Sequence, residues 1–142
     1  MPNKILITFL IIINFFCLKA HSADQIIFDV SEIEILDSGN KVIGKNRGTI
    51  TLNNGIIIES DNFEFDKIKN ILKAKGNVSI EDQINNYNFF AQNILYLKNE
   101  ERIEIEGQVD ITIDANYNFK SENILILRNE MIISSDVGAT II

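Results

Sequence analysis

Apolar and polar residues alternate along nearly the whole chain after position 25, and this pattern constrains the fold more than any other feature. A period of two sends successive side chains to opposite faces of a β-strand. No apolar stripe with the helical period runs for three turns, and the single proline is at position 2, outside the alternating region. The sequence therefore predicts an all-β chain.

Turn signals divide the alternating region into strands of an antiparallel sheet. These signals are DSGN (37–40), NNG (53–55), QINN (83–86) and KNEE (98–101). The Asn54-Gly55 pair is the strongest hairpin signal among them. The expected strands are 26–36, 40–52, 56–66, 71–81, 87–98, 102–113, 117–127 and 131–142.

Residues 1–23 are predicted to be a secretory signal peptide. Lys4 precedes an apolar run from Ile5 to Leu18, and the small residue Ala23 follows. The run of about 14 residues is short for a membrane span, which needs roughly 20, so an uncleaved anchor is the weaker alternative. We expect cleavage after Ala23 and one exported domain over residues 24–142.

Loss of this leader changes the chemistry that the chain can perform. Cys17 and His21 are the only cysteine and histidine, and both lie in the leader. The remaining residues then have no cysteine nucleophile, histidine base or disulfide, so we expect no enzyme, cofactor or metal ion. Without Lys4 and Lys19, 11 Lys and Arg residues face 20 Asp and Glu residues, a net charge of −9 that disfavours nucleic acid.

A repeat of about 31 residues underlies the alternation. The segment 61–80 aligns without a gap on 92–111, and 122–142 forms a third, weaker copy. Each copy is one hairpin, and a hairpin that cannot bury its apolar face alone must stack on its neighbours. The repeat predicts a solenoid-like or folded-over sheet.

Two glycines occupy the same place in successive copies. Gly76 follows Leu72 and Ala74 and precedes Val78 and Ile80, so alternation places it on the inner, apolar side. Gly107 repeats this phase. A glycine inside a strand marks a bend, a bulge or a close backbone approach. We expect both glycines to lie on a line where the sheet folds into a trough, their missing side chains preventing overpacking; the alternative is that they have no special role.

One segment resembles a known family. ESDNFEFDKIKNILKAKGNVSIED (59–82) is similar to the OstA-like repeat of the lipopolysaccharide-transport proteins LptA and LptD. The resemblance is strong over 55–113 and weak over 26–50 and 117–142, and FDVSEIEI and GNKVIGKNRGTITLNNGIII look most like the periplasmic N-terminal part of LptD. Residues 24–142 include no outer-membrane barrel, and the cysteines usual in LptD are missing from them. A free, LptA-like module and the N-terminal part of a longer protein both stay open.

The resemblance implies a periplasmic β-jellyroll that holds lipid acyl chains in an open apolar groove. Its partners would be lipopolysaccharide, other Lpt-type modules joined through edge strands, and an outer-membrane complex. The alternating apolar residues form a stripe that, by itself, is typical of a filled core. The resemblance implies instead that this stripe lines a groove. The expected lining residues are Phe63, Phe65, Leu72, Ala74, Val78, Ile80, Ile94, Tyr96, Ile103, Ile105, Val109 and Ile111.

Charged residues are expected on the outer face. Lys67, Lys69, Lys73 and Lys75 gather near one hairpin end, where a solvated face is favoured over contact with lipid phosphates. The carboxylates of Glu59, Asp61, Glu104 and Glu106 alternate with apolar residues and do not suggest a catalytic cleft or a calcium site. The rival to a lipid carrier is a structural, adhesin-like β-solenoid with a filled core.

Overall fold

The computed structural model describes residues 26–52, 55–114, 117–135 and 140–141, with side chains described as far as residue 135. The expected signal peptide lies outside these residues. Within the described ranges, ten strands form a single sheet: β1 (Ile26–Leu36), β2 (Lys41–Leu52), β3 (Ile56–Ser60), β4 (Asn62–Asp66), β5 (Ile71–Asp82), β6 (Tyr87–Leu97), β7 (Arg102–Ile113), β8 (Tyr117–Leu127), β9 (Ile132–Ser134) and β10 (Thr140–Ile141). Within the described part of the chain, no helix is long and apolar enough to span a membrane.

Every strand pairing in the sheet is antiparallel, which confirms the predicted fold class. Strand β1 matches the expected 26–36, and most other bounds agree to within a residue. The strand expected over 56–66 was wrong, because it is broken at Asp61 into β3 and β4. Of the strand expected over 131–142, the structure describes β9 and β10, with Met131 in a turn, and residues 136–139 and 142 lie outside the described residues.

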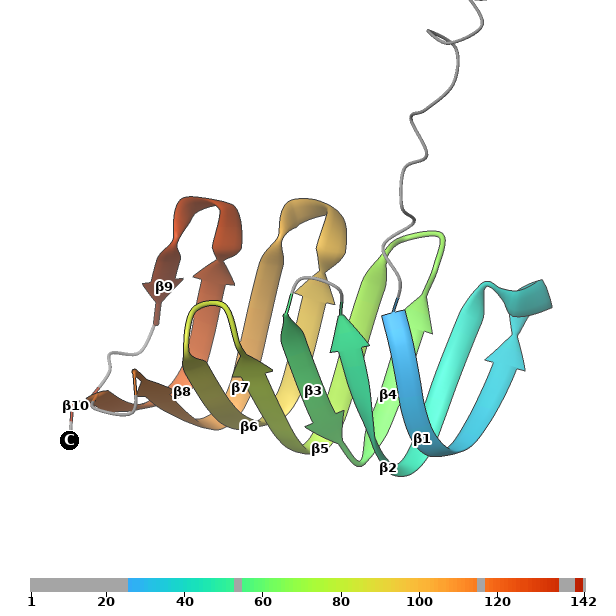
Figure 1. The fold of residues 1–142 in the computed structure, drawn as a ribbon, viewed down its shortest axis with the longest axis horizontal. Coiled ribbons are helices and arrows are strands. Elements are labelled where there is room, and N and C mark those ends of the chain that lie inside the picture. The colour runs from blue at the N-terminus through green and yellow to red at the C-terminus, as the bar shows by residue number, and fades with distance from the viewer. Residues whose placement is uncertain (1–25, 53–54, 115–116, 136–139, 142) are drawn as a thin grey trace, which may run out of the picture.

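The long strands bend near their middles, so the sheet folds into a trough with two walls (Figure 1). One half of β2 pairs with β3 and its other half with β4, and β5 likewise pairs with both. We call the wall that contains β3 the β3 wall and the opposite one the β4 wall. The 3-10 turns η1 (Asp37–Gly39), η2 (Lys98–Glu100) and η3 (Arg128–Glu130) lie at the rim of the β4 wall.

The bend falls at positions about 15 residues apart, which together form the fold line. The positions are Ser31, Asn46–Arg47, Asp61, Gly76–Asn77, Gln92, Gly107–Gln108 and Glu122. Each is a break in strand pairing or a pair of residues with positive φ, as at Asn46 and Arg47, with φ of 62° and 60°. Such bulges bend a strand sharply. The trough is therefore built by one irregularity per strand at a constant level.

Gly76 and Gly107 lie on this line, but the steric reason for them differs from the expectation. Their φ angles are +83° and +86°, a region that side chains with a Cβ rarely adopt. A Cβ on Gly76 would lie 2.7 Å from Oδ2 of Asp61, and one on Gly107 would lie 2.8 Å from Cβ of Gln92. The crowding therefore comes from side chains of the neighbouring strand at the fold line and not from the apolar interior.

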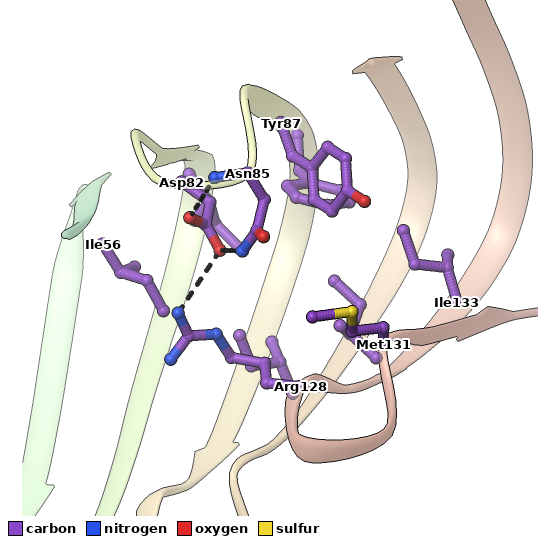
Figure 2. Close-up of a pocket in the computed structure, with 11 residues that line it drawn as sticks. Ile56, Asp82, Asn85, Tyr87, Arg128, Met131 and Ile133 are labelled. Atoms are coloured by element: carbon purple, nitrogen blue, oxygen red, sulfur yellow. Dashed lines mark hydrogen bonds and ion pairs between the residues drawn. The ribbon is translucent and has the colours of Figure 1, made fainter. Parts of the chain in front are cut away.

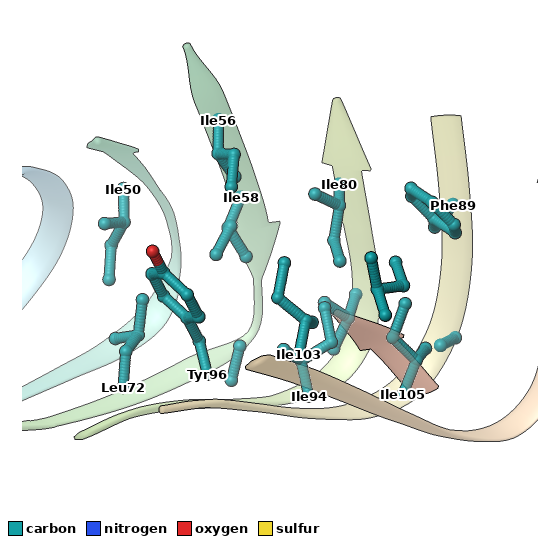
Figure 3. Close-up of a cluster of buried hydrophobic side chains, with 14 of the residues drawn as sticks. Ile50, Ile56, Ile58, Leu72, Ile80, Phe89, Ile94, Tyr96, Ile103 and Ile105 are labelled. Atoms are coloured by element: carbon teal, nitrogen blue, oxygen red, sulfur yellow. The ribbon is translucent and has the colours of Figure 1, made fainter. Parts of the chain in front are cut away.

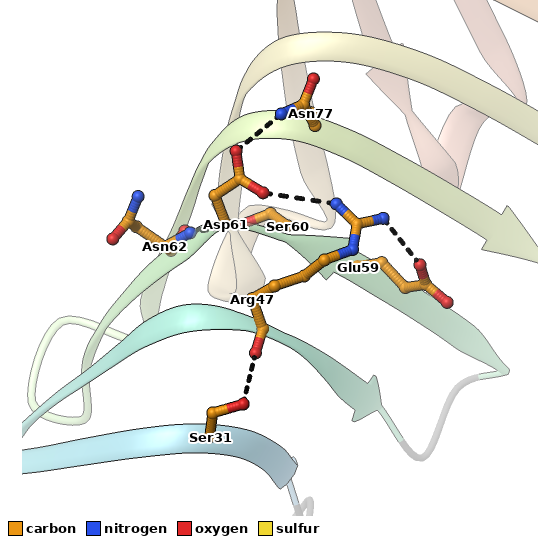
Figure 4. Close-up of polar contacts among 7 residues, drawn as sticks. All are labelled: Ser31, Arg47, Glu59, Ser60, Asp61, Asn62 and Asn77. Atoms are coloured by element: carbon orange, nitrogen blue, oxygen red, sulfur yellow. Dashed lines mark hydrogen bonds and ion pairs between the residues drawn. The ribbon is translucent and has the colours of Figure 1, made fainter.

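Polar contacts link neighbouring strands across the outside of the fold line (Figure 4). Asn77 Nδ2 donates to Asp61 Oδ2 at 2.7 Å, and the Arg47 guanidinium lies 3.3 Å from Asp61 and 3.2 Å from Glu59. The backbone continues the ladder, because Arg47 N donates to Asp61 O and Asp61 N donates to Gly76 O, both at 3.0 Å. Hydrogen bonding between strands thus persists through the bend.

Candidate functional site

The interior of the trough is one apolar cluster to which both walls contribute (Figure 3). All twelve residues expected to line a groove belong to it, and none is more than 7% exposed. The cluster also contains nine residues beyond the expected twelve: Val42, Ile50, Leu52, Ile56, Ile58, Phe89, Ala91, Ile124 and Ile126. The same alternation on β2, β3 and β8 was the signal that could have identified most of them.

In this structure the side chains of the two walls fill the space between them. Ile105 and Tyr96 are each 1% exposed, as expected for close-packed core residues. Each CH₂ group moved from water into such an interior contributes about 0.8 kcal/mol. The chemistry of the interior thus suits hydrocarbon, and hydrocarbon chains can enter it only if the walls separate.

The trough is apolar at its β1 end as well, where no further strand of the described residues covers it. Ile33 and Ile35 pair with Gly44 and Val42 of β2. Paired residues of antiparallel strands share a face, and Val42 is buried, so Ile35 faces the interior. Nevertheless Ile33 is 51% exposed and Ile35 is 61% exposed. This end presents inner-face isoleucines to solvent.

A small cavity opens at the mouth of the trough, between the rims of the two walls (Figure 2). Its volume is about 70 Å³, room for a few water molecules or methylene groups and far too little for a whole acyl chain. Much of its lining is apolar and includes Ile56, Ile80, Phe89, Ile103, Ile126 and Ile133. Asp82 and Arg128 supply its charged edge.

Asp82 ends β5 at the rim of the β3 wall and occupies an inward-facing position. It follows the buried residues Val78 and Ile80 in alternation and is 6% exposed. Its Oδ1 accepts hydrogen bonds from the backbone N–H groups of Ile84 and Asn85, each at 3.1 Å, and its Oδ2 accepts one from Asn85 Nδ2 at 2.8 Å. Among the buried residues of the described chain, Asp82 is the only charged one.

Arg128, in η3 on the β4 wall, reaches across the mouth to Asp82. Its Nη2 lies 3.5 Å from Asp82 Oδ2, and its Nη1 donates to Glu101 Oε2 at 2.7 Å. Tyr96 holds the other oxygen of Glu101 through a hydrogen bond of 2.9 Å. Burial lowers the pKa of Arg128, but the hydrogen bond to Glu101 and the charge of Asp82 outweigh it and raise the pKa above its usual value. Arg128 therefore stays charged.

Three of the four outer carboxylates named from the sequence, Glu59, Asp61 and Glu104, lie in ion pairs and not in an acid–base pair. Glu104 binds Arg102 at 2.7 Å, while Glu59 and Asp61 share Arg47. No group of three or more His, Cys, Asp or Glu side chains in the described ranges could hold a metal ion. The lysines near the hairpin end are on the outer face: Lys73 lies 3.8 Å from Glu64, and Lys69 lies 3.7 Å from Asp66.

The fold and its interior define a class: an antiparallel β-jellyroll whose folded sheet encloses an apolar trough. Among solved structures, the chain is similar to that of LptH from Pseudomonas aeruginosa, described as the LptA-homologous periplasmic component of the conserved lipopolysaccharide transport device. The TM-score is 0.73 at 12% sequence identity, and the match covers 84% of this chain and 94% of LptH. At this identity the likeness establishes the fold. No protein-family model matches the chain, and neither does any curated protein.

Proposed function

We propose that this protein is a periplasmic lipopolysaccharide-transport module, without enzymatic activity, that shields acyl chains between the walls of its trough. The observation that carries the proposal is the apolar stripe of both walls, which runs along the interior and ends in exposed isoleucines at β1. The OstA-like residues of 59–82 and the fold shared with LptH support the same function. Binding needs no cofactor, because burial of the chains supplies the free energy.

Transfer between modules follows from the same chemistry. An acyl chain that moves from one apolar trough to a similar one is in an equivalent apolar environment before and after the move. The step therefore costs little net free energy. We propose that the modules join through their edge strands, with the side of β1 that pairs with no described strand accepting a strand of a partner. Such a join would cover Ile33 and Ile35, which are otherwise exposed.

Assembly through β1 is tested by the variant Ile33→Lys/Ile35→Lys. Both side chains are more than half exposed, so the variant should fold normally. It should associate more weakly in sedimentation velocity across a concentration series, because charge replaces the apolar contact area. The matched control is Ile68→Lys, at an exposed isoleucine in the turn after β4. Equal association of both variants with the unaltered protein would exclude this edge.

The module is proposed to work at the outer-membrane end of the transport route. The segments FDVSEIEI and GNKVIGKNRGTITLNNGIII, which form β1 and β2 and continue into β3, resemble the N-terminal part of LptD more than LptA. On this basis its partners would be lipopolysaccharide, a neighbouring Lpt-type module and an outer-membrane complex. The acidic surface makes nucleic acid an unsuitable partner.

A structural, adhesin-like role is the second candidate, and the filled interior favours it. A photo-crosslinking residue at Ile105 separates the two functions, with one at the neighbouring outer position Glu104 as the control. The carrier hypothesis predicts that Ile105 captures lipopolysaccharide in cells and Glu104 does not. If Ile105, Leu72 and Val109 all capture only protein in a folded, exported chain, the structural role replaces the carrier.

A further inference from the structure

The ion pair of Asp82 and Arg128 joins two walls that meet elsewhere through apolar side chains. Asp82 belongs to the β3 wall and Arg128 to the β4 wall, and the residues are 46 positions apart in the sequence. In the repeat, the position of Asp82 corresponds to Ile113, and other inward-facing positions nearby are apolar. The carboxylate thus interrupts an inner stripe whose pattern would place an isoleucine there.

Both partners are held in place from their own walls. Asp82 accepts three hydrogen bonds from the turn that it begins, and Glu101, itself fixed by Tyr96, holds Arg128. The ion pair is shielded from water, since the side chains of Arg128 and Asp82 are 14% and 7% exposed. An ion pair with preorganised, shielded partners is less screened by salt than a surface pair.

We propose that Asp82 and Arg128 form a clasp across the mouth of the trough, and that the cavity beneath it admits the end of an alkyl chain of an amphiphile when the clasp opens. This inference rests on the proposed function and adds the place and the control of lipid uptake. The apolar lining suits a hydrocarbon end, and the charged edge would keep a polar head group outside. A closed clasp lowers the fraction of molecules able to accept a chain, which slows uptake and weakens apparent binding.

The charge can be removed from either partner with little other change. Asp82→Asn keeps an oxygen that can accept from the Ile84 and Asn85 N–H groups, and it leaves Arg128 paired with Glu101. Arg128→Gln removes the cation from the other wall. The matched controls are Asp110→Asn and Arg102→Gln, which alter ion pairs of 3.4 Å and 2.7 Å on the outer face.

The first measurement is stopped-flow uptake of an uncharged pyrene-labelled decanol by the full chain. Each clasp variant should take up the probe about three- to tenfold faster than its control, as expected for the loss of one partly buried ion pair. The double variant Asp82→Asn/Arg128→Gln should be no faster than the faster single variant, because both changes break one interaction. Uptake rates within twofold of the controls, or additive accelerations, would overturn the clasp.

The second measurement is amide hydrogen exchange at the rim turns 83–86 and 128–131, which needs no lipid. At these turns the amide hydrogens of the clasp variants should exchange faster than those of the controls. At the fold line the clasp variants and the controls should exchange at equal rates. If exchange accelerates but no variant takes up decanol or lipopolysaccharide, the ion pair closes the walls but the proposed function and uptake beneath the clasp are rejected. If the unaltered protein binds lipopolysaccharide and neither exchange nor uptake responds, the clasp alone is rejected.

Discussion

Two turns with the same local structure, one on each wall, have different roles. Asp66 on the β4 wall accepts hydrogen bonds from the N–H groups of Ile68 and Lys69, and Asp82 on the β3 wall accepts them from Ile84 and Asn85. In both, an aspartate at the end of a strand caps the turn after it, two and three residues on. The local sequences, DKIK and DQIN, give no reason to expect different functions.

The difference lies in the phase of the preceding strand. Asp66 follows Phe65, which faces inward, so its carboxylate faces outward and lies beside Lys69. Asp82 stands two residues after the inward-facing Ile80 and therefore faces the interior. A shift of one residue relative to the pleat thus converts a surface cap into a contact between walls. In this fold, the face on which a residue lies determines its role more than its local motif does.

The strongest contrast between faces is expected at Ile105 and Glu104, which are adjacent on β7. Ile105→Asp would place an unpaired carboxylate in the core and should lower the free energy of unfolding by more than about 4 kcal/mol. Glu104→Ala removes only an outer ion pair and should cost less than about 1 kcal/mol. Urea denaturation followed by circular dichroism measures both. Similar losses would mean that β7 does not present these faces as described.

The next contrast compares glycines at the fold line and at a rim turn. Gly39 has a φ of +93°, and no atom of the described residues lies within 4 Å of an added Cβ, so Gly39→Ala measures backbone strain alone. Gly107→Ala adds the overlap with Cβ of Gln92 and should cost about 1–3 kcal/mol more. Gly76→Ala should lie between them, because the Asp61 carboxylate can move aside. Equal thermal shifts for the three variants would show that the fold line is not sterically constrained.

A smaller contrast is expected between the two turn-capping aspartates. Asp82→Ala leaves two partly buried N–H groups without their acceptor and removes the counter-charge of Arg128, so we expect a loss of about 1–3 kcal/mol. Asp66→Ala exposes the equivalent N–H groups to water, which can replace the carboxylate, and its loss should be smaller. Thermal unfolding of both variants is the measurement. A larger loss for Asp66→Ala would contradict the importance of strand phase.

The smallest effect concerns pH. The hydrogen bond from the backbone N–H of Lys69, with the Lys69 charge and the Ile68 N–H, outweighs desolvation and lowers the pKa of Asp66 from 3.8. A carboxyl with a lowered folded-state pKa stabilises the fold above its unfolded-state pKa and loses this contribution as the pH falls through the folded-state value. Asp66→Asn should therefore be less stable than the unaltered protein at neutral pH, with a difference that shrinks below pH 3.8. A constant difference across an acid titration of stability would refute this assignment.

Alternation and turn signals were sufficient to predict the fold class and most strand bounds, because each depends on neighbours in the sequence. They also placed twelve residues in one interior cluster, although their contact with lipid stays a prediction. The break at Asp61 escaped notice, although the buried phase shifts there by one residue, from Ile58 and Ser60 to Phe63 and Phe65, because the polar run 59–62 hides the shift. The face of Gly76 was also predicted wrongly. Simple alternation places its Cβ position on the inner face, but the positive φ turns that position toward Asp61 of the neighbouring strand.

The Asp82–Arg128 contact could not be predicted from the sequence. The contact depends on the distance between the two walls and on the direction in which the side chain of Arg128, the first residue of η3, points. In the repeat, Arg128 takes the place of Lys98, another cation at a rim turn, and so looks like an ordinary solvated residue. The sequence shows only that Asp82 is a carboxylate at a position where alternation predicts an apolar residue. This does not indicate which residue is its partner.

The regular spacing of the fold line limits how the length of such a protein can evolve. Because inner and outer faces alternate with a period of two, a single-residue insertion within a strand would exchange the faces of all residues up to the next bulge. Insertions at the rim turns would spare the walls, and duplication of a whole hairpin of about 31 residues would leave every phase intact. Viable length variants should therefore differ by entire hairpins or in the rim loops, and the length of the apolar interior would change in discrete steps.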